Sequence, residues 1–121
     1  MVSSYVLFFI LAGLGAYFRH FVSSSITPIL GTLLVNVAGC YLMGVMVMMK
    51  NEGQIKTTFW FTIAVGFLGA LTTFSGVIYD FIRLFEDKRY LLAVSYLLGT
   101  NLLGALAGLA GYKGLLYIPS K

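Results

Sequence analysis

The chain alternates between four long apolar runs and three short polar turns. None of the runs contains Lys or Glu, and only the third contains an acid, Asp80. The turns hold charges and helix-breaking residues, namely Pro28 in the first, KNEGQIK in the second and RLFEDKR in the third. The apolar runs cover residues 2–18, 29–49, 59–82 and 90–112.

Each run is close to the length of about 20 apolar residues that a helix needs to cross a bilayer. A spanning segment must also satisfy its peptide groups internally, which favours a helix. The composition agrees, since 60% of the residues are hydrophobic and 10% are charged, far from the balance of soluble domains. We therefore predict an all-α, multi-pass integral membrane protein, with one transmembrane domain over residues 1–121 and spans near 2–20, 29–49, 58–82 and 90–113.

The positive charges are balanced between the two sides of this bundle. Because four spans place both termini on one side, the Lys and Arg residues can be counted by side, and the count favours neither orientation. We therefore expect dual topology and an antiparallel two-fold dimer. Alternatively, Arg19 lies inside the first helix and does not count, which leaves a weak bias. The residues counted are Lys50, Lys56, Lys113 and Lys121 on the terminal side, and Arg19, Arg83, Lys88 and Arg89 on the other.

Several classes of function find no support in the sequence. The net charge of +4 is scattered over short turns, so we expect membrane lipid rather than nucleic acid beside the basic residues. Cys40 is the only cysteine, which excludes an internal disulfide and a cysteine metal cluster. The chain has no HExxH motif, no phosphate loop and no grouping of Ser, His and acid, and Asp80 has no basic partner at helical spacing inside its run. We therefore expect that the protein is not an enzyme.

The third run gathers three hydroxyl residues, Thr72, Thr73 and Ser75, within the segment GFLGALTTFSGVIYD. Such hydroxyls can bond back to carbonyls of their own helix, which needs no functional role. Three of them close to Gly66 and Gly69 favour instead a helix that breaks at mid-membrane, because glycine tolerates unusual torsions. Carbonyls freed by a break suit a small cation such as sodium, while hydroxyls and ring edges beyond it can face an anion.

Polar residues in the other spans are the further candidates. The amide of Asn36 lies in the middle of an apolar run, where it must find partners or destabilise the protein. It either joins helices by a hydrogen bond or offers its two N–H donors to an anion. Arg19 either reaches toward headgroups or concentrates anions at a pore mouth. Tyr96 and Thr100 lie four residues apart and form either a polar track or ordinary interhelical contacts.

Three motifs, GAYFR, GTLLVN with Gly39 after it, and GFLGALTTFS, occur in this order and together resemble the CrcB/Fluc family of fluoride channels. The resemblance covers essentially the whole chain. It implies a fluoride-selective channel that exports cytoplasmic fluoride passively and confers fluoride resistance, in the cell membrane of a prokaryote. It also implies an antiparallel homodimer with two pores at the interface and a structural Na+ where the two broken third helices cross.

The resemblance further implies roles for individual residues. The backbone carbonyls of Gly69 and Thr72 would bind the sodium ion. Asn36 would donate to fluoride, and Phe74 would present the positive edge of its ring to the ion. The remaining implied positions are Thr73, Ser75, Tyr96 and Thr100 along the fluoride pore and Arg19 in the vestibule.

The chain departs from the family's usual Phe-Ser-Thr-Phe, because it reads FSGV at 74–77. Val77 replaces the second pore phenylalanine, and Gly76 replaces the threonine. Either the pore works with one ring per subunit, or the chain pairs with a related subunit that completes it. The balanced charges favour the homodimer over this heterodimer.

Two rival functions remain open from the sequence. A small proton-coupled multidrug transporter also has four spans and dual topology, but it needs a membrane-embedded glutamate, and the first run contains no acid. A purely structural membrane subunit would use Thr72, Thr73 and Ser75 only to join helices.

Overall fold

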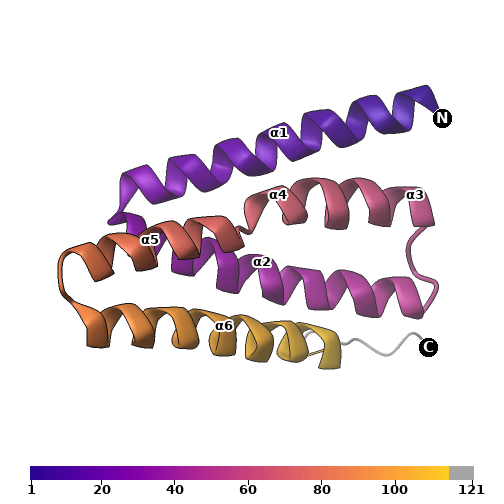
Figure 1. The fold of residues 1–121 in the computed structure, drawn as a ribbon. Helices are drawn as coiled ribbons and strands as arrows, with labels where there is room; N and C mark the ends of the chain where they lie inside the picture. The colour runs from indigo at the N-terminus through magenta and orange to yellow at the C-terminus, as the bar shows by residue number, and fades with distance from the viewer. Residues whose placement is uncertain (115–121) are drawn as a thin grey trace.

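The computed structural model describes residues 1–114, and these residues form helices joined by short turns, with no strand among them (Figure 1). Four helical segments are long and apolar enough to cross a membrane. The predicted all-α class and the four spans are therefore confirmed. The elements are α1 (Val2–Ser25), α2 (Pro28–Asn51), α3 (Thr57–Trp60), η1 (Phe61–Leu68), α4 (Gly69–Leu71), α5 (Phe74–Glu86) and α6 (Tyr90–Lys113).

Helix α1 is longer than the sequence predicts, because it continues past residue 20 to Ser25. Arg19 lies inside this helix, but Lys50, Arg83 and Lys113 also lie within helices, so this placement does not decide between the two charge counts. Lys121, which was counted on the terminal side, lies outside the described residues. The orientation in the membrane stays a prediction.

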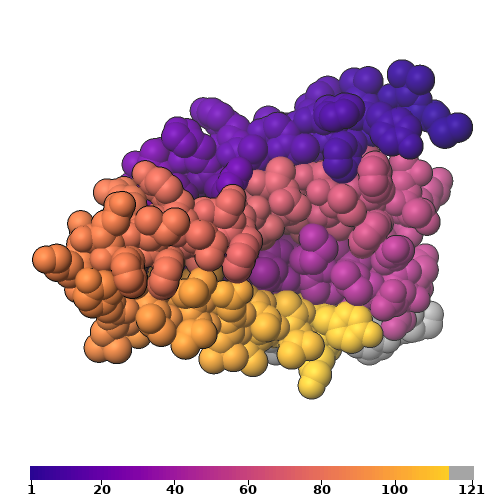
Figure 2. Space-filling model, viewed as in Figure 1, coloured from indigo at the N-terminus to yellow at the C-terminus, as the bar shows by residue number. Residues whose placement is uncertain are grey.

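The helices run lengthwise beside one another, with α1 along one edge and α6 along the opposite edge (Figures 1 and 2). The most extensive contact is between α2 and α6. Glycines allow this close approach, because a Cβ at Gly44 would collide with the carbonyl of Gly108 and one at Gly111 with the carbonyl of Tyr41. Small residues thus let these two spans pack closely at these positions.

The third span consists of two halves that pack against different neighbours. Its first half, through η1 and α4, contacts α1 and α2, whereas α5 contacts α6 and α2. Two separate clusters of buried side chains correspond to this division. Leu71 belongs to the first cluster and Val77 to the second, so the interruption between them lies where one core ends and the other begins.

The interruption consists of Thr72 and Thr73, which are extended with φ, ψ of −83°, 152° and −150°, 121°. The predicted break in the third span is confirmed. The reason given for it from the sequence is wrong, because Gly69 is helical at −62°, −33° and supplies no unusual torsion. The extended torsions belong to β-branched threonines, which adopt them readily.

Candidate functional site

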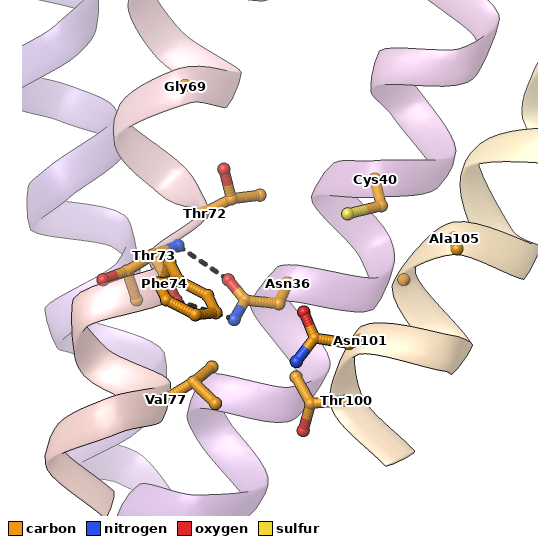
Figure 3. Close-up of a pocket in the computed structure, with 11 residues that line it drawn as sticks. Asn36, Cys40, Gly69, Thr72, Thr73, Phe74, Val77, Thr100, Asn101 and Ala105 are labelled. Carbon is orange, nitrogen blue, oxygen red and sulfur yellow. Dashed lines mark hydrogen bonds between the residues drawn. The ribbon is translucent and has the colours of Figure 1, made fainter. Parts of the chain in front are cut away.

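A pocket of about 350 Å³ lies beside this break. Asn36 and Cys40 line it from α2, residues between 69 and 77 line it from the third span, and residues between 100 and 105 line it from α6 (Figure 3). The structure therefore gathers polar groups from three spans around one hollow.

Asn36 holds the break through both ends of its carboxamide. The Thr73 N–H donates to Asn36 Oδ1 at 2.7 Å, and Asn36 Nδ2 donates to the Thr73 carbonyl at 3.0 Å (Figure 3). The Asn36 side chain is only 7% exposed. The expectation that this buried amide finds partners is confirmed, and the partner is backbone on another span. Because the amide group has two N–H donors, one of them is left for a ligand.

The three hydroxyls of the third span are held in different ways. Thr72 Oγ1 donates to the Leu68 carbonyl on its own turn at 3.0 Å. Thr73 Oγ1 caps α5 by accepting from the Gly76 N–H at 2.9 Å, and it lies 3.2 Å from the exposed Ser75 Oγ. The back-bonding explanation therefore holds for Thr72, whereas the Thr73 hydroxyl caps α5 and lies within hydrogen-bond distance of the Ser75 hydroxyl.

The break also alters the carbonyls that precede it. In a continuous helix the Thr73 N–H would donate to the Gly69 carbonyl, but here it donates to Asn36. The Gly69 carbonyl thereby loses its helical donor, and the Thr72 carbonyl belongs to extended chain. Residues 1–114 contain no cluster of His, Cys, Asp or Glu that could hold a metal ion. The uncharged oxygens at the break fit a hard monovalent cation better than a transition metal.

Two further groups face the pocket. Phe74 is 64% exposed at the start of α5, and its ring lies beside the Asn36 amide (Figure 3). Thr100 is buried, and its hydroxyl has no hydrogen-bond partner within the described part of the chain. Buried hydroxyls without a partner are uncommon, and this oxygen is enclosed within the subunit and points away from the Asn36 amide (Figure 3).

Tyr96 does not line this pocket. Its hydroxyl donates to Asp80 Oδ2 at 3.0 Å, and both side chains are buried between α5 and α6. Asp80 is a residue that sequence reasoning missed, because the search was for a basic partner. An acid within an apolar run must find some donor, and that signal could have pointed to it.

Arg19 and Val77 have other surroundings. Arg19 is half-buried in α1 and does not line the pocket, and its Nε atom has no partner among residues 1–114. Val77 lines the pocket, but it is 2% exposed and packs in the core cluster with Leu84 and Ala93. The position of the family's second pore phenylalanine is therefore occupied by a core residue.

These observations define a four-span helical membrane protein whose third span is interrupted beside a pocket that Asn and Thr side chains help to line. Residues 6–112 match the family described as "CrcB-like protein, Camphor Resistance (CrcB)", and the chain belongs to this family. The resemblance stated from the three motifs is confirmed.

Relatives from two bacterial genera are similar to the chain. A protein of Helicobacter pylori (strain G27) is 37% identical over 83 residues, which are 69% of this chain and 64% of the relative. A protein of Citrifermentans bemidjiense is 37% identical over 92 residues, or 70% of this chain and 74% of the relative. Both are named "Fluoride-specific ion channel FluC". The match thus spans about two thirds of the H. pylori protein.

Proposed function

We propose that this chain is a subunit of a fluoride-selective channel in the cell membrane of a prokaryote. The single observation that carries the proposal is the broken third span, which Asn36 holds open beside a pocket with unused donors. The channel names of the relatives support it as well.

The chemistry of fluoride makes such a site intelligible. Fluoride is small and strongly hydrated, so a selective passage must replace its water with donors at close range. The remaining N–H of Asn36, the Thr100 hydroxyl and the ring edge of Phe74 are donors of this kind. Thr73 and Ser75 add hydroxyls at the N-terminal end of α5. Tyr96 continues the polar side of α6 one turn from Thr100.

The proposed transport is passive export. Fluoride enters cells as neutral HF and dissociates inside, so the membrane potential can drive the anion out. The ion crosses without chemical change, which agrees with the absence of catalytic motifs in the sequence. Arg19, whose Nε atom has no partner among residues 1–114, would raise the anion concentration near the entrance.

We further propose that two copies assemble antiparallel, with this pocket in the interface. The carbonyls of Gly69 and Thr72 would hold a sodium ion there. When bound, that ion would neutralise carbonyl dipoles that otherwise repel one another. A second copy of this chain is favoured over a related subunit, although Val77 leaves each pore with one phenylalanine from this motif.

Efflux from liposomes tests the proposal against its rivals. The purified protein should release fluoride, read with a fluoride electrode, and should leave chloride and a cationic dye inside. Dye release coupled to protons would instead support a multidrug transporter. No release of any of the three would support a structural subunit.

A further inference from the structure

We infer that Asn36 serves both ions: its amide oxygen keeps the cation site open, while its amide nitrogen serves the anion. This inference rests on the proposed function, because it assigns the cation site to the Gly69 and Thr72 carbonyls. It adds that one side chain, which contacts neither of those carbonyls, decides whether they are available.

The hydrogen bonds around the break depart from the helical pattern at Thr73. The Thr72 N–H still donates to the Leu68 carbonyl at 3.1 Å, as in a regular helix. The next donor, the Thr73 N–H, is the first to leave the helical pattern, and it does so by donating to Asn36 Oδ1. The break therefore begins where Asn36 competes with the Gly69 carbonyl for one donor.

Loss of that acceptor would change the backbone. A buried N–H without a partner costs free energy, and the acceptor that helical geometry offers to Thr73 is the Gly69 carbonyl. Without Asn36 we expect α4 to extend by one residue, so that the Thr73 N–H donates to the Gly69 carbonyl. A carbonyl that accepts a helical hydrogen bond is a poorer ligand for a cation, so sodium binding should weaken.

The other half of the carboxamide is fixed by the same contact. Because Oδ1 faces an N–H and Nδ2 faces a carbonyl, the amide cannot turn its oxygen toward the pocket without losing both bonds. Its free N–H is therefore held toward an anion. Asn36 is thus a positioning residue for the cation site and a binding residue for the anion.

The chain offers a matched control in Asn51. This residue ends the same helix α2, is exposed and does not line the pocket. Asn51→Ala removes the same chemical group without touching the break.

The test measures thermal unfolding of the purified protein in detergent, at constant ionic strength, as Na+ replaces K+. The parent and Asn51→Ala should be stabilised by Na+ alone. For Asn36→Ala, the Na+ concentration that gives half of the maximal stabilisation should be about tenfold or more higher than for the parent. Asn36→Asp keeps an oxygen that accepts from Thr73, so its response to Na+ should persist while its fluoride efflux falls.

An Asn36→Ala protein that responds to Na+ as the parent does would overturn the inference and leave the proposed cation site standing. If the thermal unfolding of the parent does not respond to Na+, both the inference and the proposed cation site are overturned. Fluoride efflux would still test whether the protein is a channel. If Asn36→Ala does not fold, hydrogen exchange of the parent tests the inference instead. The Thr73 amide should then exchange slowly, and fast exchange at this amide would overturn the inference.

Discussion

The hydroxyl of Tyr96 on α6 donates to the carboxyl of Asp80 on α5 at 3.0 Å, in the part of the bundle beyond the break. This contact joins the second half of the third span to the fourth span. It is formed between two buried side chains, which makes its loss costly.

Tyr96→Phe should therefore destabilise the protein. The substitution leaves a buried carboxyl without its donor, which costs about 1–3 kcal/mol. Thermal unfolding in detergent measures the change, and Tyr79→Phe is the control because Tyr79 is exposed on the same α5. Equal stability of the two variants would show that the contact contributes nothing.

Thr100→Val should separate stability from transport. The Thr100 hydroxyl makes no hydrogen bond within residues 1–114, so its replacement by a methyl group removes no protein contact. We expect unchanged or slightly higher stability together with fluoride efflux that falls about tenfold.

Thr62→Val is the matched control for this substitution. Thr62 is also buried, but its hydroxyl donates to the Thr58 and Phe59 carbonyls, and it does not line the pocket. Its variant should conduct as the parent does. If Thr100→Val conducts fluoride at the parent's rate, this hydroxyl is not part of the proposed pathway.

Phe74→Ala should lower fluoride efflux by about tenfold, since a ring edge contributes on the order of 1 kcal/mol to a favourable contact. The ring is 64% exposed in the subunit, so the fold should survive its loss. Phe9→Ala, which removes an exposed ring from α1, is the control for a general effect of losing an aromatic residue. An equal drop in both variants would argue against a specific role of Phe74.

Gly44→Ala should weaken the contact between α2 and α6. The new methyl group would meet the Gly108 carbonyl, and overpacking of this kind costs about 1–3 kcal/mol. Gly99→Ala has no atom within 4 Å of its added Cβ and should leave unfolding unchanged. Parent-like unfolding of Gly44→Ala would mean that the helices can separate without cost.

Much of the fold follows from patterns that lie within single segments of the sequence. The four spans follow from the length of the apolar runs, and the break follows from the cluster of hydroxyls at Thr72, Thr73 and Ser75. The π-helical stretch η1, by contrast, has no signal that a hydrophobic pattern reveals.

The site was harder to predict because its contacts join different spans. The need of Asn36 for a partner was evident, but its partner depends on how α2 and the third span align, which a single sequence does not encode locally. The same holds for Asp80 and Tyr96. The torsional explanation of the break by glycine was wrong, because Gly69 is helical and Thr72 and Thr73 supply the extended torsions.

The most direct test is fluoride efflux from liposomes that contain Asn36→Ala, compared with Asn51→Ala at equal protein content. We expect Asn36→Ala to lose fluoride efflux by about a hundredfold, because both the break and a donor are lost, while Asn51→Ala stays within about threefold of the parent. Equal fluoride efflux from the two variants would contradict this expectation.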